Sequence, residues 1–128
     1  MSKKVTGVLI NTEGGTFGKA TLKGDLESYY KALKCTCIDI VYRKIGGEVF
    51  AIYCDDEGLL KRNPKPSAFN AEGKAQLVGN LFIARIDAEG ETISLTSSEI
   101  ELIHEQVRIG VFSIGGEIDI RPFLKLDD

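Results

Sequence analysis

Residues 35 to 54 read CTCIDIVYRKIGGEVFAIYC, and this stretch indicates how the chain folds. Residues 35–43 contain β-branched and aromatic side chains in an alternating arrangement, which is typical of a β-strand. Residues 49–54 are rich in the same residue types. Gly46 and Gly47 stand between them, and two consecutive glycines supply the positive φ angles that a two-residue hairpin turn requires. The stretch therefore predicts an antiparallel β-hairpin.

The same strand–turn–strand pattern occurs in two other parts of the chain. Turn residues 11–15 separate two alternating segments, and a second glycine pair, Gly115-Gly116, separates two more. Residues 59–70 hold two of the three prolines, so we expect mostly loop there. The further predicted strands span residues 5–10, 16–22, 76–87, 92–95, 109–114 and 117–123.

Two short segments show helical periodicity. Within residues 26–33, Leu and Tyr side chains recur at positions i, i+3, i+4 and i+7, and Asp25 before them is a suitable N-cap. The second segment opens with Thr96-Ser97-Ser98-Glu99, a capping box in which a cap hydroxyl is followed three residues later by a carboxylate. The apolar face of this second helix is predicted to carry Ile100, Ile103, His104 and Val107.

Together these elements predict an α+β fold. We expect a largely antiparallel, bent sheet of seven or eight strands with two short helices. The chain of 128 residues is long enough to bury its own hydrophobic core. A single domain over residues 1–128 is therefore predicted.

The composition is that of a soluble globular protein, with 43% hydrophobic and 27% charged residues. The formal net charge of −3 provides no overall attraction to nucleic acid polymers or to anionic membranes. No apolar run approaches the roughly 20 residues of a membrane span. Three cysteines without a regular spacing predict reduced thiols in a cytoplasmic protein.

Residues 13–21, EGGTFGKAT, resemble a phosphate-binding loop at first sight. Such a loop has a glycine five residues before its Gly-Lys pair, a hydroxyl side chain after the lysine, and a helix after the loop. Here Glu13 stands at the first position, and Ala20 follows Lys19. The alternation through residues 16–22 predicts a strand where the phosphate loop requires a helix. We therefore predict a β-hairpin turn and not a nucleotide-hydrolysing site.

The chain offers few groups for catalysis or metal binding. Cys35, Cys37 and Cys54 lack the Cys-x2-Cys spacing of zinc sites, so we expect buried structural thiols. His104 is the only histidine, and it falls on the apolar face of a predicted helix, where packing is favoured over catalysis. The carboxylate pair Asp127-Asp128 is interpreted as a tail. The sequence therefore predicts no metal site, no cofactor, no catalytic residues and no enzymatic activity.

One cationic segment is a candidate binding surface. Residues 60–66 read LKRNPKP, and the prolines reduce the entropy that this loop loses on binding. An arginine here can engage a carboxylate or a phosphate through two hydrogen bonds, and a tyrosine can stack on a base. The alternative is a solvated loop without a ligand. The predicted ligand-binding residues are Lys61, Arg62, Asn63, Lys65, Arg85 and Tyr53.

Several short blocks of the chain follow one another in the order shown by a known family. They include the strand segments 37–41 and 49–54, LKRNP at 60–64, LVGNL at 77–81 and SLTSSEI at 94–100. Over about residues 5 to 105, the chain resembles a family catalogued only as a domain of unknown function, number 3846. The resemblance implies a small protein of bacteria, phages or mobile elements, where small proteins often counter host defences, and it implies no particular activity. The hairpin at 109–123 is expected to be an addition to this pattern, with an extra edge for self-association.

Two main hypotheses about function follow, and a small hydrolase or transferase is a third. The first is a non-enzymatic, homo-oligomeric protein that binds a small anionic ligand and sequesters it, a nucleotide-derived immune signal being one example. The absence of a catalytic set, the stiff cationic loop and the family resemblance motivate it. The alternative is a protein-interaction module that inhibits or recruits a host protein through a strand edge or the terminal hairpin. Neither hypothesis involves a membrane or a nucleic acid polymer.

Overall fold

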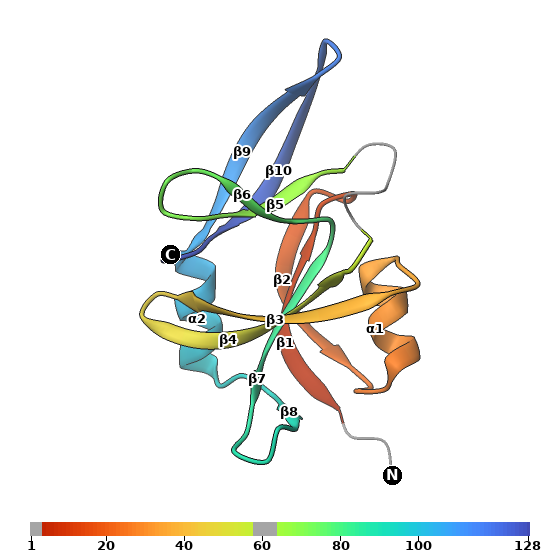
Figure 1. Ribbon diagram of the computed structural model, residues 1–128, viewed down its shortest axis with the longest axis vertical. Helices are drawn as coiled ribbons and strands as arrows, with labels where there is room; N and C mark the ends of the chain where they lie inside the picture. The colour runs from red at the N-terminus through yellow and green to blue at the C-terminus, as the bar shows by residue number, and fades with distance from the viewer. Residues whose placement is uncertain (1–3, 58–63) are drawn as a thin grey trace.

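The computed structural model describes residues 4–57 and 64–128, which form two β-sheets and two helices (Figure 1). Within these residues, the first sheet has six strands: five follow the order β2-β1-β7-β4-β3, and β8 pairs with β7. The second sheet has four strands in the order β6-β5-β10-β9. In chain order the elements are β1 (Val5–Asn11), β2 (Thr16–Leu22), α1 (Leu26–Leu33), β3 (Ile38–Ile45), β4 (Glu48–Asp55), β5 (Pro66–Phe69), β6 (Ala75–Val78), β7 (Leu81–Ile86), β8 (Thr92–Ile93), α2 (Ser97–Glu105), β9 (Val107–Ile114) and β10 (Glu117–Lys125).

Most neighbouring strands are antiparallel, as the hairpin patterns predict. Gly46 and Gly47 have φ angles of 58° and 91° and form the turn between β3 and β4. Gly115 and Gly116, with φ angles of 61° and 86°, join β9 to β10 in the same way. Among the described strands, β5 and β10 are the one parallel pair. The predicted α+β class with largely antiparallel pairing is confirmed.

Helices cover both faces of the first sheet (Figure 1). On one face, Tyr29 and Leu33 of α1 pack against Tyr53 and Phe82 of the sheet. On the other face, α2 contributes Ile103 to a larger core that it shares with both sheets. Neither helix of the described chain combines the length and the apolar character needed to cross a membrane. The buried members of the larger core are Val8, Ile10, Ile45, Phe50, Ile52, Cys54, Ala68, Leu81, Ile83, Leu95, Ile103, Val107, Leu124 and Leu126.

The single strand predicted over residues 76–87 is in fact two strands, β6 and β7, in different sheets. Gly79 adopts φ 80° between them, which only glycine adopts readily. The next side chain, Asn80, is buried: its Oδ1 accepts a hydrogen bond from the Thr12 backbone N–H at 2.9 Å, and its Nδ2 donates to the Ala32 carbonyl at 3.1 Å. These inward hydrogen bonds interrupt the strand, because a buried amide must find partners.

Two further boundaries differ from the sequence-based prediction. Residues 66–69 were expected to be mostly loop, but they form β5 in the interior of the second sheet. The helix α2 ends at Glu105, so Val107 is the first residue of β9 and not part of the helical face. The added strand β5 and the division of residues 76–87 give about ten strands in two sheets within the described residues, where seven or eight were predicted.

Asp127 is not a free tail. Its two carboxylate oxygens accept hydrogen bonds from the backbone N–H groups of Gly46 and Gly47, at 2.9 and 2.7 Å. Its own backbone N–H donates to the Lys44 carbonyl at 2.9 Å. The segment after β10 therefore fastens the second sheet to the β3–β4 turn of the first.

The predicted capping box is confirmed and is linked to the first sheet. Glu99 accepts from the Thr96 backbone N–H at 2.8 Å, and the Glu99 N–H donates to the Thr96 hydroxyl at 3.2 Å. The Glu99 carboxylate also pairs with Arg85 of β7. Burial raises the pKa of Glu99, but the hydrogen bonds from Thr96 and the charge of Arg85 outweigh burial and hold it below its ordinary value.

We expect Glu99→Gln to destabilise the protein by about 1–2 kcal/mol at pH 7, because a charge-assisted pair becomes a neutral one. Because the pKa of Glu99 is lower in the folded protein than its ordinary value of 4.5, the ionised carboxylate stabilises the fold above pH 4.5. This stabilisation is lost as the pH falls through the pKa of Glu99 in the folded protein. The difference from the wild-type protein should therefore shrink below about pH 4.5. Urea unfolding at several pH values measures the difference in unfolding free energy between the variant and the wild-type protein. Glu101→Gln, on the exposed side of α2, is the control. A difference that is constant from pH 7 to pH 3 would contradict this account.

Candidate functional site

The structure places the described residues of the predicted ligand site in three separate environments. Tyr53 is only 5% exposed and stacks on a tyrosine of α1 at a centroid distance of 4.4 Å. Arg85 reaches the other helix and pairs with Glu99. The Nζ of Lys65 lies 3.6 Å from Asp119 of β10. The Tyr53 ring lies in the core and not on the surface, so the structure does not bring these three residues together, and their role in binding stays a prediction.

The other three predicted residues, Lys61, Arg62 and Asn63, lie outside the described residues. Their role in binding stays a prediction. The strand β5 of the second sheet begins at Pro66, shortly after them in the sequence. That sheet carries the surface with the clearest binding geometry.

The strands β9 and β10 form a two-stranded arm that projects from the second sheet (Figure 1). Directly opposed residues of an antiparallel pair have side chains on the same face. The register therefore divides the arm into two sides, which we call the groove side and the outer face. The groove side carries Gly110, Phe112, Asp119, Arg121, Phe123 and Lys125; the outer face carries Ile109, Val111, Ser113, Ile118, Ile120 and Pro122.

Phenylalanine rings from three strands line a groove on the groove side of the arm. Phe69 of β5 meets Phe123 of β10 edge to face at 5.2 Å, and Phe112 of β9 lies 6.1 Å from each of them. The volume of this aromatic groove is about 440 Å³, within the range of small-molecule sites. Gly110 is also part of the lining, and a Cβ there would lie 2.8 Å from the Phe112 ring and 2.9 Å from the Phe123 ring. The rings can hold these positions because residue 110 has no side chain.

Arg121 supports the aromatic groove from the interior of the protein. It is 1% exposed, and its Cζ lies 3.6 Å from the centroid of the Phe112 ring. Its Nε and Nη2 donate to the Pro66 carbonyl at 3.3 and 3.2 Å, and its Nη1 donates to Asp119 at 2.8 Å. This hydrogen bond from Arg121 lowers the pKa of Asp119. The guanidinium therefore joins β10 to β5 and positions a groove ring, and its charge is already neutralised.

One end of the aromatic groove is cationic. Lys125 lines it, and none of the described lining residues is acidic. Arg108 is directly opposite Phe123 on the same side of the arm. Its guanidinium donates to the carbonyls of Glu105, the last residue of α2, and Val107, the first residue of β9. The groove thus combines aromatic walls with positive charge at one end, although Arg108 itself is not part of the lining.

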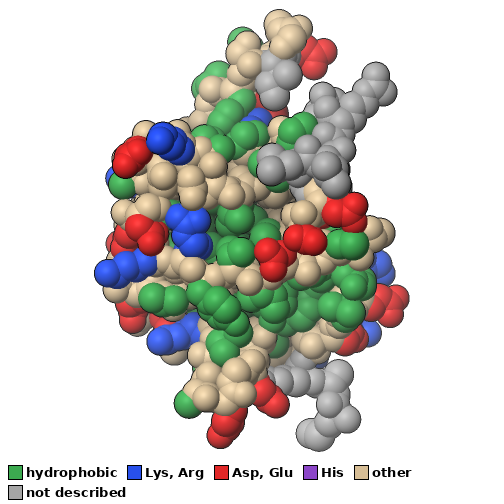
Figure 2. Space-filling view, in the orientation of Figure 1, with side chains coloured by type: hydrophobic (Ala, Val, Ile, Leu, Met, Phe, Trp, Pro, Cys, Tyr) green, Lys and Arg blue, Asp and Glu red, His purple; other side chains and the backbone are tan. Residues whose placement is uncertain are grey.

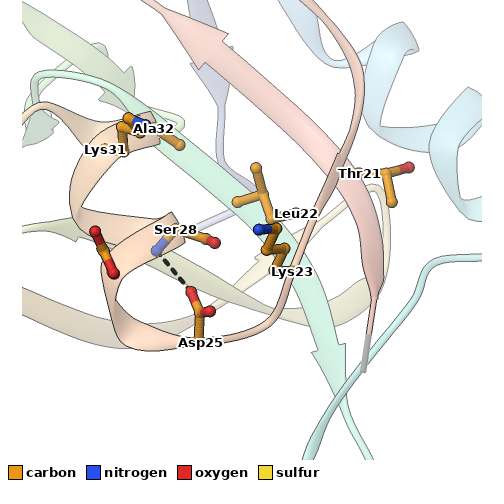
Figure 3. Close-up of a pocket in the computed structure, with 8 residues that line it drawn as sticks. Thr21, Leu22, Lys23, Asp25, Ser28, Lys31 and Ala32 are labelled. Carbon is orange, nitrogen blue, oxygen red and sulfur yellow. Dashed lines mark hydrogen bonds between the residues drawn. The ribbon is translucent and has the colours of Figure 1, made fainter. Parts of the chain in front are cut away.

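A second hollow, of about 430 Å³, lies between the end of β2 and the start of α1 (Figure 3). Lys23 and Lys31 line it, but so do Asp25 and Glu27, so the formal charges balance. Asp25 already caps the helix by accepting from the Ser28 N–H at 2.8 Å, and hydrogen bonding to Ser28 lowers its pKa. No aromatic residue is among the described residues that line this hollow. It is a less suitable anion site than the aromatic groove.

A third hollow, of about 220 Å³, has the opposite electrostatic character. Asp39, Asp55 and Asp56 line it together with Cys54, whose pKa burial raises to about 12. A thiol with this pKa is protonated at neutral pH and is a poor nucleophile. In residues 4–57 and 64–128, no group of three or more His, Cys, Asp or Glu side chains is arranged to hold a metal ion. This hollow is acidic and would repel the anionic ligand that the sequence analysis expects.

The outer face of the arm is apolar and uncovered over much of its length. Ile109, Val111, Ile118 and Ile120 are 60%, 69%, 72% and 61% exposed. Hydrophobic side chains are visible on the projecting arm in the space-filling view (Figure 2). Scattered exposed apolar residues are ordinary, but neighbouring β-branched side chains on one strand pair form a patch, and such patches mark interaction surfaces.

The fold and these surfaces define a small two-sheet α+β domain whose candidate site is a binding groove. A family model described as Domain of unknown function (DUF3846) matches residues 5–108, and the chain belongs to this family. The resemblance seen in the sequence blocks is thereby confirmed. Residues 109–128, which contain most of the arm, lie beyond the match. No curated protein and no solved structure matches the chain.

Proposed function

We propose that this protein is a non-enzymatic binding protein that holds a planar, anionic small molecule in the aromatic groove. The observation that carries the proposal is the combination of Phe69, Phe112 and Phe123 with Lys125 around one hollow of about 440 Å³. The same class of ligand was expected from the sequence, but at a different set of residues. The groove now replaces Tyr53 and Arg85 as the proposed site.

Each part of the ligand chemistry has a counterpart in the groove. A flat ring gains about 1–3 kcal/mol when it stacks on an aromatic side chain. The absence of a side chain at Gly110 leaves room for the Phe112 and Phe123 rings that would stack on the ligand. Lys125 favours a phosphate or carboxylate at the end of the ring system, and no described lining residue repels it. A nucleotide has this chemistry, so nucleotide-derived ligands are the first class to test.

The role of such binding is a further part of the proposal. A protein without catalytic machinery changes the free concentration of a ligand only by holding it, so sequestration of a small signal is the role that we propose. A cytoplasmic location and an origin in a phage or mobile element fit this role and remain predictions from the sequence.

A titration with adenosine monophosphate, adenosine and inorganic phosphate tests the ligand chemistry. The nucleotide should bind more tightly than either fragment, because only the nucleotide uses both the rings and Lys125. Lys125→Glu should weaken nucleotide binding about 10-fold or more, which corresponds to about 1.4 kcal/mol. Lys74→Glu is the matched control, because Lys74 is an exposed lysine near the groove that does not line it. Calorimetry and the shift in melting temperature report binding.

Two outcomes would count against the site or the function. Reversal of Lys61, Arg62 and Lys65 together tests the loop predicted from the sequence. If that variant abolishes binding and Lys125→Glu does not, the ligand sits on the loop and not in the groove. If neither common mononucleotides nor cyclic dinucleotides nor a host-cell small-molecule extract shifts the melting temperature, the proposal of a ligand-holding protein is overturned.

A second candidate function, a protein-interaction module, is favoured by the outer face of the arm. Its four exposed β-branched residues lie on β9 and β10, and β9 is also an edge strand of the second sheet. Edge strands and uncovered apolar faces are common sites of protein association. The outer face and the groove lie mainly on opposite sides of one arm by register, and Val111 is the residue that belongs to both.

A further inference from the structure

We infer that the outer face of the arm binds the outer face of a second copy of this chain and forms a two-fold symmetric dimer. This inference rests on the second candidate function, that the outer face is an interaction surface, and adds the identity of its occupant. The dimer places two arms face to face and leaves both aromatic grooves on the outside. It also gives a physical form to the homo-oligomer that the sequence analysis expects.

The shape of the arm explains why its outer face would be stabilised by a binding partner. An isolated two-stranded hairpin is at best marginally stable in water unless a face packs against other structure. At the base of the arm, Val107 and Leu124 continue the outer face into the core, where both are buried. Beyond them, the same face carries Val111 and Ile118, which are 69% and 72% exposed. The arm therefore extends a core surface into solvent without covering it.

The chemistry of the outer face favours a copy of itself as the occupant. In a two-fold dimer the same surface is used by both copies, so a net charge on that surface faces an equal net charge on the other copy. The outer face, over residues 109–113 and 118–122, contains no charged side chain, and Ser113 is its one polar member. The charged residues of the arm, including Arg108, Asp119 and Arg121, are all on the groove side. The segregation of charge to one side is what an apolar two-fold contact requires.

The extent of the face sets the expected strength of the dimer. Strand residues rise about 3.3 Å each and paired strands lie about 4.8 Å apart, so the face measures roughly 20 Å by 10 Å. That is smaller than the ~800 Å² that each partner contributes to a standard interface. We therefore expect a reversible dimer with a dissociation constant on the order of 10 μM, and not a permanent one.

Sedimentation velocity of the full chain over a concentration series tests the inference. The wild-type protein should change from monomer to dimer across the micromolar range. Val111→Lys places two like charges near each other in the dimer and should weaken it at least 100-fold. Val49→Lys is the matched control, since Val49 is also a strand valine and is 60% exposed, but on β4 away from the arm. Ile118→Lys is a second variant on the outer face, and the melting temperature of each variant shows whether it is folded.

The possible results separate this inference from the functions on which it rests. The inferred dimer is overturned if the wild-type protein stays monomeric to about 0.5 mM. It is also overturned if Val111→Lys and Val49→Lys weaken the dimer equally. If the wild-type protein is monomeric, pull-downs with both variants test whether the outer face binds another protein. If Val111→Lys loses a captured partner that Val49→Lys retains, the interaction function is supported. If the two variants capture the same proteins, the interaction function is rejected. Nucleotide titration of Ile118→Lys reports the groove separately, because Ile118 does not line the groove and the groove does not need the dimer.

Discussion

Gly7→Ala is expected to destabilise the protein by about 3 kcal/mol, the upper part of the usual range for overpacking a core. Gly7 lies in β1, next to the central strand β7. A Cβ at this position would be 2.2 Å from the Ile83 carbonyl oxygen and 2.8 Å from the Phe82 ring. The nearest atom belongs to the backbone, so a side-chain rotation cannot relieve the contact, and β1 has to move away from β7.

Thermal unfolding measures this effect, and a loss of about 3 kcal/mol corresponds to a fall in melting temperature of roughly 10 °C for a chain of this size. Gly18→Ala is the matched control. Gly18 lies in the neighbouring strand β2, has an ordinary φ angle, and a Cβ added there would have nothing within 4 Å. We expect a change within about 0.5 kcal/mol there, since alanine is at least as well suited to a strand as glycine. Equal effects of the two substitutions would show that β1 and β7 are not packed as described.

Arg121→Ala is expected to destabilise the protein by about 3 kcal/mol for a different reason. The substitution removes a fully buried side chain, leaves the Pro66 carbonyl without its two guanidinium donors and withdraws support from the Phe112 ring. Asp119 contributes less to the loss, because it is partly exposed and still has Lys65 within 3.6 Å. Among the contacts of the second sheet, the pairing of β10 with β5 should be weakened most by this substitution.

Arg121→Met separates packing from hydrogen bonding, because methionine refills much of the volume but has no donor. We expect it to recover about half of the loss, since replacing a buried charge by an apolar side chain of similar size is often tolerated. Arg108→Ala is the control on the neighbouring strand, where the arginine is exposed and a change of about 0.5 kcal/mol is expected. Urea unfolding measures all three variants. If Arg121→Ala is no more destabilising than Arg108→Ala, Arg121 is not the structural link between the two strands.

Features that depend on a few adjacent residues could be predicted without the structure. The turns at Gly46-Gly47 and Gly115-Gly116 follow from positive φ angles that glycine adopts at little cost. The capping box at Thr96 and Glu99 follows from hydrogen bonds within one helical turn. The absence of a phosphate loop at Lys19 is equally local, and β2 occupies the place where such a loop needs a helix. From these elements the α+β class and the antiparallel pairing could be predicted.

Which distant residues meet depends on tertiary packing. The β5 and β10 strands pair in parallel although they are far apart in the chain, and this pairing assembles the rings of Phe69, Phe112 and Phe123. Tyr53 looked like a ligand-stacking residue, but α1 folds over it and completes a core with Phe82. The alternating pattern of a strand shows which side chains share a face. It does not show which of the two faces another element will cover. That choice depends on long-range contacts, so the hairpins and the helix cap could be read from the sequence, while the aromatic groove and the uncovered face of the arm could not.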